Sequence, residues 1–594
     1  MLKNLLITLS FLAMLTTSSQ AQNLTYEVSM PKPQTHYFEV SLTYDGEMSK
    51  KGYLDFKMAT WTPGSYLLRE FSKSVEKVSA ADQSGKILEI KKLSKNTWRV
   101  FAKKVKSLKF SYRVYAFEHS VRTSFLDIAH GYINGTSVFV FIDGKQDLAA
   151  TVKIIPHKTF KKITTALKPT SDIWTRKANN YDHLADSPIE IGNHEVWEFT
   201  AAGVPHKVVM FGDNNADKNK VITDLTKIAE TGTTIFGEHP CDQYIYFIHN
   251  MSYGGGGLEH AFGTSLIVSR FNYGSESGYN SFLGLASHEY FHLWNVKRVR
   301  PEALGPFDYE HENYTTMLWV VEGFTSYFDD IVLLRAGLKE GDDYLTLVQN
   351  NINNIEGQQG NKVQPVSEAS LDAWVKAYRP NENSRNTTIS YYSKGAVIAT
   401  MLDLIIIHNT KSEKRLDDVM KYLYNEYYKK KGRGYTDAEF KAVVEKIAGV
   451  KLDDFFKDYI NGTKTIDYNK YLNYAGLAVD ILSPTDLKLG IGTKNEDGRL
   501  TISYVESGSP AYESGLNVKD EIIAVDGYRV NDSVSHFLKG KKVGERLTFL
   551  ITRDTQIKEV IVELQMPNSK YYQLKNVDTI SDTQKKVLRK WLGE

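Results

Sequence analysis

The segment His288-Glu289-Tyr290-Phe291-His292 constrains this chain more than any other feature of its sequence. Positions i and i+4 of a helix share one face, so His288 and His292 can present two imidazoles to one metal ion. Glu289 then projects beside that ion, where its carboxylate can take a proton from a bound water molecule. The pattern predicts a zinc-binding helix with a general base next to the metal.

Glu322 is the natural third ligand, because it lies in the middle of a second helix-like segment, 314–334. A buried carboxylate without a partner is costly, and a metal ion is one partner that could justify it. Two imidazoles and one carboxylate leave an open position for water, as in catalytic zinc sites. We therefore predict one Zn²⁺ per chain, bound by His288, His292 and Glu322. The alternative is two structural histidines and a salt-bridged glutamate.

Composition bounds the remaining possibilities. The chain has 594 residues and a net charge of +2, so nothing in its charge favours nucleic acid as a partner. Its length suggests roughly four domains. Cys241 is the only cysteine, which excludes an intrachain disulfide and a CxxC metal site.

The first 21 residues have the pattern of a secretory signal peptide. Lys3 precedes an apolar run, 5–15, and small residues follow at the expected cleavage positions, 19–21. The apolar run is too short to span a bilayer, and no second long apolar stretch follows. We predict a periplasmic or secreted protein without a stable membrane span, starting at Gln22. The alternative is an uncleaved anchor.

The hydrophobic patterns divide the first part of the mature chain into two domains. Residues 22–203 show short alternating runs between turn residues, which predicts an antiparallel β-sandwich. Residues 204–478 begin with strands around one helix and become mostly helical after the zinc helix, which predicts an α+β catalytic domain. Within that domain, 357–386 is largely polar and irregular, and we expect so long a segment to border the active site.

Residues 479–565 resemble a PDZ domain, because a short glycine loop, 489–492, precedes the segments 509–516 and 520–527. A PDZ domain would bind extended chain ends by strand addition, with the loop amides receiving a carboxylate. The alternative is a packing domain with a blocked groove. Residues 566–594 are predicted to form a polar tail with a short amphipathic end.

A glycine-rich segment, 254–257, precedes Glu259 and a strand-like run, 262–268. Glycines such as Gly256 and Gly257 let a substrate backbone approach closely, and a strand edge can pair with an extended peptide. A carboxylate at Glu259 could hold the free α-amine of the substrate, which would make the enzyme an aminopeptidase. The alternative is a glutamate that supports the loop, and an endopeptidase would then be possible.

Several segments together resemble the glycyl aminopeptidase family of bacterial zinc metallopeptidases. They are 61–66 (WTPGSY), 256–260 (GGLEH), 292–301 (HLWNVKRVRP), 322–327 (EGFTSY) and 391–395 (YYSKG). The resemblance covers nearly the whole mature chain, including the PDZ-like module. It implies a thermolysin-like catalytic domain related to aminopeptidase N, and removal of small N-terminal residues, glycine or alanine, from peptides.

The resemblance also implies roles for single residues. Tyr392 matches the tyrosine that donates a hydrogen bond to the tetrahedral oxyanion in the aminopeptidase N relatives, although Tyr391 is adjacent. Ser326 takes the position of a zinc-supporting aspartate in thermolysin, where a hydroxyl could still orient a histidine ligand. His260 replaces the asparagine of the aminopeptidase N motif. The interval of 30 positions from His292 to Glu322 (322 − 292) is longer than in those relatives.

The leading hypothesis is therefore a zinc aminopeptidase, a hydrolase that acts on peptides. A zinc endopeptidase is the second hypothesis. A third, from another class, is a peptide-binding scaffold in which the PDZ and β-domains capture chains and the zinc site is vestigial. The intact Glu289 and Tyr392 argue against a scaffold, because a relic is expected to lose its general base first.

Overall fold

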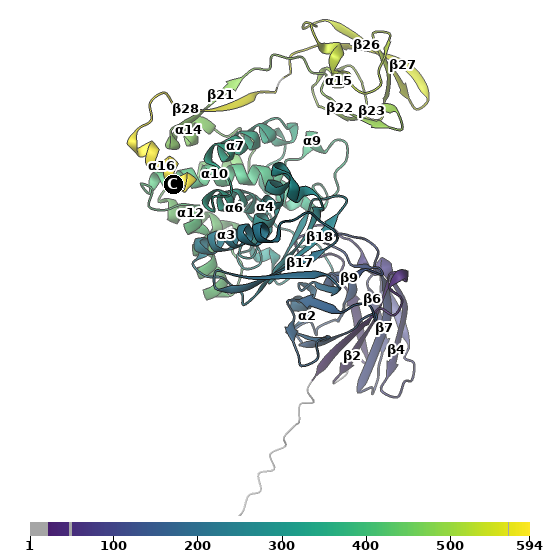
Figure 1. The fold of residues 1–594 in the computed structure, drawn as a ribbon. Helices are drawn as coiled ribbons and strands as arrows, with labels where there is room; N and C mark the ends of the chain where they lie inside the picture. The colour runs from purple at the N-terminus through teal and green to yellow at the C-terminus, as the bar shows by residue number, and fades with distance from the viewer. Residues whose placement is uncertain (1–21, 47–49, 568, 594) are drawn as a thin grey trace, which may run out of the picture.

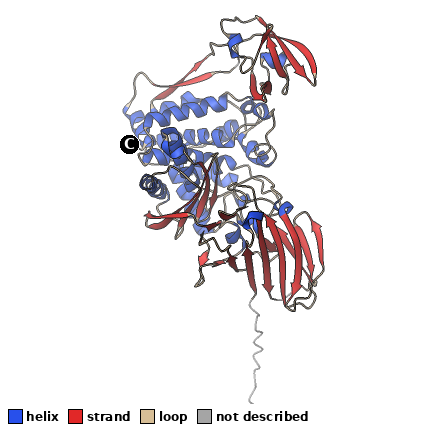
Figure 2. Cartoon of the chain, turned by 45° about the vertical axis from the view of Figure 1, so that its right-hand side comes forward, coloured by secondary structure: helices blue, strands red, loops and turns tan. Residues whose placement is uncertain are grey.

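The computed structural model describes residues 22–46, 50–567 and 569–593, so the predicted signal peptide lies outside the described residues. Three bodies follow one another along the chain (Figure 1). A β-rich N-terminal domain packs against a larger, mostly helical body, and a small β-domain stands apart at the far end. Most of the helices lie in the middle body, whereas strands dominate the two end bodies (Figure 2).

The N-terminal domain is a sandwich of a seven-stranded sheet, order β13-β14-β11-β1-β2-β7-β4, and a four-stranded sheet, order β10-β3-β6-β5. A third sheet, β12-β15-β9-β8, continues toward the helical body. Buried and less buried residues alternate along β1, as expected for a strand with one face on a core. The sandwich is antiparallel except for the parallel pair β1–β11. The elements are β1 (Asn23–Ser29), β2 (Tyr37–Asp45), β3 (Tyr53–Met58), β4 (Val75–Asp82), β5 (Ile90–Ser94), β6 (Thr97–Phe101), β7 (Ser107–Tyr115), β8 (Phe125–Leu126), β9 (His130–Ile133), α1 (Gly135–Val138), β10 (Val140–Ile142), β11 (Ala150–Ile155), β12 (Lys162–Thr165), β13 (Lys168–Pro169), β14 (Thr175–Ala178), α2 (Tyr181–Ala185) and β15 (Ile189–Gly192).

The catalytic body begins with a five-stranded sheet, order β16-β17-β18-β20-β19. Its strands are β16 (Glu195–Ala201), β17 (Val204–Phe211), β18 (Tyr244–Met251), β19 (Gly257–His260) and β20 (Gly263–Ser269), and α3 (Lys218–Phe236) joins β17 to β18. The predicted boundary between residues 203 and 204 is therefore too late. The strand β16 pairs with β17 along its whole length, so it belongs to the catalytic sheet.

Helices dominate the rest of this body. They are α4 (Glu276–Phe291), α5 (Leu318–Val321), α6 (Gly323–Arg335), α7 (Gly341–Glu356), α10 (Tyr391–Asn409), α11 (Leu416–Leu423), α12 (Asp437–Ala448), α13 (Asp453–Phe455) and α14 (Tyr468–Leu472). The segment Ser384–Asn409 is long and apolar enough to cross a membrane, but 83% of its most apolar window is buried inside the protein. Such burial is typical of the central helix of a globular domain.

Two glycines bring α6 and α10 into direct contact. A Cβ on Gly323 would lie 2.4 Å from the Cα of Gly395, so no other residue fits at this crossing without displacing one backbone. The close crossing sets Glu322, just before α6, near Tyr392, in the first turn of α10. The sequence segments 322–327 and 391–395 are thus two halves of one helix contact.

The segment 357–386 is more ordered than its sequence predicts. It forms the short helices η5 (Gln359–Lys362), α8 (Val366–Leu371), η6 (Asp372–Trp374) and α9 (Ser384–Thr387). Trp374 packs edge-on against Trp61 and Tyr66 of the N-terminal domain, with ring centroids 5.1 and 5.6 Å apart. Aromatic packing across the two domains supplies the order that the polar sequence does not suggest.

The predicted PDZ domain is the separate body at the end of the molecule (Figure 1). It contains β22 (Ile491–Glu496), β23 (Arg499–Val505), α15 (Pro510–Glu513), β24 (Glu521–Val525), β25 (Tyr528–Arg529), β26 (Arg546–Arg553) and β27 (Gln556–Glu563). An antiparallel ribbon of β21 (Leu477–Leu482) and β28 (Tyr571–Asn576) joins it to the helical body.

The C-terminal segment has the predicted amphipathic end, but it packs on the protein instead of forming a tail. After β28 the chain returns to the helical body and ends in α16 (Asp582–Leu592). The Trp591 side chain is fully buried there and contacts the ring of Tyr344. Most residues of α16 are polar and face outward, and a few apolar residues on one face of the helix dock it on the protein. The mostly polar composition therefore does not predict that the helix packs.

Candidate active site

The three predicted zinc ligands meet in one cluster, in which His292 and Glu322 are buried and His288 is partly exposed. His288 Nε2 lies 3.5 Å and His292 Nε2 lies 3.2 Å from Oε2 of Glu322, and the two Nε2 atoms are 3.2 Å apart. Ligands at about 2.0–2.1 Å from a tetrahedral zinc lie roughly 3.3 Å from one another, so these three atoms fit that ion. Burial would raise the pKa of Glu322, but the two imidazoles outweigh it and hold that pKa at about 2.

Each imidazole is oriented by a hydrogen bond at its other nitrogen. His292 Nδ1 lies 2.7 Å from the carbonyl oxygen of Asn295, and His288 Nδ1 lies 2.8 Å from Oδ2 of Asp329. Such partners leave the Nε2 lone pairs free to bind a metal. The sequence assigns this supporting role to Ser326, whereas the structure gives it to Asp329. The available signal was the spacing, because position 329 lies two helical turns after Glu322 on the same face of α6.

Asp329→Ala is expected to weaken zinc binding by about 10- to 100-fold, because His288 would lose the partner that fixes its ring. Competition with a chromophoric chelator would measure the dissociation constant. Asp330→Ala is the matched control, because the adjacent Asp330 pairs with Lys339 instead of a ligand. An equal loss of affinity in both variants would contradict the orienting role.

Glu289 lies beside the three ligands without being one of them. It is buried, and among the described residues its Oε2 has no hydrogen-bond partner. Strand β19 passes directly over it, since a Cβ on Gly257 would fall 2.1 Å from Oε1 of Glu289. Burial raises the pKa of Glu289 to about 7, against the opposing effect of His288 and His292. Such a carboxylate can exchange a proton near neutral pH.

Glu259 also faces the ligand cluster. It lies on β19, the edge strand of the catalytic sheet, and its side chain is buried. Carboxylate oxygens of Glu259 and Glu289 and a ring nitrogen of His292 lie within 4.8 Å of one another. Gly257 lines the same cavity, and Gly256, at a φ of 114°, carries the chain into β19. An extended peptide can therefore pair with the edge strand β19 beside Glu259.

Two residues of the N-terminal domain complete the cavity, which has a volume of about 380 Å³. A Cβ on Gly64 would lie 2.5 Å from Oε2 of Glu259, so the 61–66 segment closes directly on that carboxylate. Arg122 also lines the cavity, with its Nη2 3.4 Å from the carbonyl oxygen of Gly257. The sequence does not single out Arg122, because nothing in its local pattern indicates a contact with β19.

Tyr392, rather than Tyr391, lines the cavity. Its ring centroid lies 6.2 Å from that of His288. Burial and the nearby Glu322 raise the pKa of Tyr392 well above 10, so its hydroxyl stays protonated and can donate a hydrogen bond. Tyr391 does not line the cavity, although its hydroxyl lies near those of Tyr392 and Tyr378.

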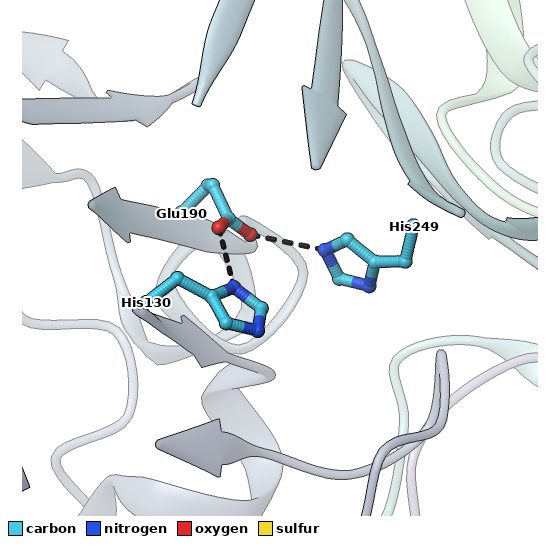
Figure 3. Close-up of side chains that lie close together, drawn as sticks. All are labelled: His130, Glu190 and His249. Atoms are coloured by element: carbon cyan, nitrogen blue, oxygen red, sulfur yellow. Dashed lines mark hydrogen bonds and ion pairs between the residues drawn. The ribbon is translucent and has the colours of Figure 1, made fainter. Parts of the chain in front are cut away.

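A second polar cluster ties the two domains together (Figure 3). His130 of β9 and His249 of β18 lie on either side of Glu190 of β15, and all three side chains are buried. Their contacts, His130 Nδ1 to Oε1 at 2.7 Å and His249 Nε2 to Oε2 at 3.0 Å, are typical of N–H···O hydrogen bonds. Burial would raise the pKa of Glu190, but the imidazoles hold it well below its usual range. Because β18 belongs to the catalytic sheet, the cluster fixes the N-terminal domain against it.

Comparison with known proteins identifies the family. The model of the M61 glycyl aminopeptidase matches residues 281–398, which contain the three predicted ligands, Glu289 and Tyr392. The model of the peptidase M61 N-terminal domain matches residues 25–193, and a PDZ model matches 488–564. The crystal structure of an aminopeptidase N family protein from Idiomarina loihiensis is 32% identical, with a TM-score of 0.88 over 96% of this chain and 100% of that one. This chain belongs to the M61 glycyl aminopeptidase family.

Membership in the M61 family confirms the predicted fold class and the predicted enzyme class, a zinc metallopeptidase. Two other proteins are similar in part. A probable CtpA-like serine protease from Staphylococcus haemolyticus is 26% identical over 172 residues, and the match spans 28% of this chain and about a third (32%) of that protein's length. An M1 zinc metallopeptidase from Deinococcus radiodurans is 11% identical, with a TM-score of 0.46 over 75% of this chain and 94% of that one.

Proposed function

We propose that this M61 family member is a zinc-dependent aminopeptidase that releases small N-terminal residues, glycine or alanine, from peptides. The buried carboxylate of Glu259, on a free strand edge and within reach of Glu289, supports this function most directly. A buried carboxylate needs a cationic partner, and the α-ammonium group of a peptide is one. The close approach of Gly64 to Glu259 leaves little room for a large N-terminal side chain.

The chain's own residues account for the remaining steps. The edge of β19 aligns the peptide backbone, with its free amine at Glu259. Zinc bound by His288, His292 and Glu322 would lower the pKa of a water molecule and polarise the scissile carbonyl. Glu289 accepts a proton from the attacking water and delivers it to the leaving amine. Tyr392 donates a hydrogen bond to the carbonyl oxygen as negative charge develops on it.

A pair of chromogenic substrates tests this function. The enzyme is expected to cleave glycyl-p-nitroanilide and to lose about 10²-fold or more of its kcat/KM on the N-acetylated compound, because acetylation removes the charge that pairs with a buried carboxylate. In Glu259→Gln, the ratio of kcat/KM for the free substrate to kcat/KM for the acetylated substrate is expected to approach one. Chelation of zinc should abolish both activities.

The other hypotheses predict different results. Equal cleavage of free and acetylated substrates would identify an endopeptidase. Peptide binding without any chelator-sensitive cleavage would identify a scaffold. The proposal also places the protein in the periplasm or outside the cell, after removal of residues 1–21. N-terminal sequencing of the exported protein would then start at Gln22.

A further inference from the structure

Arg122 is a cation on the wall of the cavity, and the structure gives it no anionic partner among residues 22–46, 50–567 and 569–593. None of the ion pairs among the described residues includes it, and its Nε is buried without a hydrogen-bond partner. Its single side-chain hydrogen bond among these residues is the long contact of 3.4 Å to the carbonyl oxygen of Gly257. A partly buried guanidinium usually pairs with a carboxylate or phosphate, so its position on the peptidase cavity calls for a ligand.

The loop that carries Arg122 is fixed relative to β19. The preceding residue, Val121, is 1% exposed and packs in one apolar cluster with Leu258 and Ile267. The carbonyl oxygen of Val121 also accepts a hydrogen bond of 3.3 Å from the Asn134 side chain. The backbone next to Arg122 is therefore fixed beside the beginning of β19, and the guanidinium reaches Gly257 from there.

The direction of a bound peptide follows from the two ends of β19. In the proposed function, the free α-amine of the bound peptide lies at Glu259. A peptide strand that pairs antiparallel with β19 then runs from Glu259 toward Gly257. These positions are two residues apart, or about 7 Å at roughly 3.4 Å per residue. Arg122 contacts Gly257. The guanidinium of Arg122 therefore lies near the position that the C-terminus of a bound di- or tripeptide would reach.

We propose that Arg122 binds the C-terminal carboxylate of the substrate, and that di- and tripeptides are the preferred substrate class. This inference rests on the proposed aminopeptidase function and adds a second recognition point to it. Glu259 and Arg122 are opposite charges that line one cavity, beside two positions of β19 that are about 7 Å apart, and a short peptide zwitterion carries the complementary charges at its two ends. Longer peptides would place an uncharged backbone at Arg122.

Matched acids and amides test this inference without any change to the protein. The enzyme is expected to cleave Gly-Ala at least about 10-fold faster, in kcat/KM, than Gly-Ala-amide, because only the acid offers a charge-assisted bidentate contact. The preference for the acid over the amide should fade as the peptide is lengthened beyond three residues. Equal rates on Gly-Ala and its amide would overturn the proposal.

Substitution then assigns the preference to one residue. Arg122→Gln is expected to bring the ratio of kcat/KM for Gly-Ala to that for Gly-Ala-amide down to about one, and Arg122→Lys should retain part of the preference as a point charge. The control is Arg113→Gln, which removes a cation that pairs with Glu76 on the N-terminal domain and should change neither rate. An unchanged preference in Arg122→Gln would exclude Arg122 from this role.

Failure of this inference differs from failure of the proposed function. Glycyl-p-nitroanilide carries no carboxylate, so its cleavage reports the aminopeptidase function alone. Cleavage of that compound without any acid preference would leave an aminopeptidase that does not read the substrate C-terminus. Absence of free-amine dependence would overturn both proposals.

Discussion

Glu289→Gln is expected to lower kcat by about 10²- to 10⁴-fold while the zinc content stays near one ion per chain. Glutamine has the size of glutamate but cannot take a proton from water or return it to the leaving amine, and general acid–base catalysis contributes about this factor. Glu289 is also separate from the three ligand atoms, which remain 3.2–3.5 Å from one another. Steady-state kinetics and metal analysis by mass spectrometry measure the two quantities.

Glu276→Gln is the matched control for this prediction. Glu276 is the first residue of the same helix, α4, and is exposed to solvent, so its substitution should leave both kcat and zinc content unchanged. If Glu289→Gln lost its zinc, Glu289 would be a metal ligand and the assignment of general base would be wrong. Retained zinc with unchanged kcat would remove Glu289 from the mechanism altogether.

Tyr392→Phe is expected to lower kcat by about 10²- to 10³-fold, equivalent to about 2.7–4 kcal/mol, with little change in KM. The lost hydroxyl would act on the oxyanion, which exists only as the reaction proceeds, so substrate binding should be spared. Folding should also be spared, because phenylalanine keeps the ring that stacks on Tyr391.

The neighbouring tyrosine provides the control. Tyr391→Phe removes a hydroxyl that lies near that of Tyr392 but does not line the cavity, so kcat should fall far less than in Tyr392→Phe. A large effect in Tyr391→Phe and none in Tyr392→Phe would reverse the assignment. Equal large losses of kcat in both variants would show that they act on packing instead of on the oxyanion.

The ligand cluster could be predicted because its information is local. His288, Glu289 and His292 lie within one helical turn and a half, and helical periodicity fixes which of them share a face. Glu322 needs only one further inference, that a carboxylate in an apolar helix has a partner. The family segments 322–327 and 391–395 contain Glu322 and Tyr392, and the contact between Gly323 and Gly395 brings these two segments together.

A residue from another domain that carries no local signal could not be predicted in this way. Arg122 comes from the N-terminal domain and reaches β19 only after the two domains have packed, whereas Gly64 lies in the family segment 61–66 that the sequence already indicates. Helical spacing could have indicated Asp329 as the residue that orients His288. The resemblance instead indicated Ser326, which lies about one helical turn earlier. The domain boundary failed for a related reason, since β16 has the alternating pattern of the preceding sandwich and differs only in its partner, β17.

The return of the chain to the helical body makes the PDZ domain an insertion rather than an appendage. Both of its connections run through the ribbon of β21 and β28, and the last helix seals the catalytic body with Trp591. A stop codon placed before the PDZ domain would therefore also remove a buried tryptophan, a loss of about 3–5 kcal/mol in comparable cores. A clean separation of the peptidase from its PDZ domain requires joining residue 482 to residue 571 by a short turn, which keeps the C-terminal helix in place.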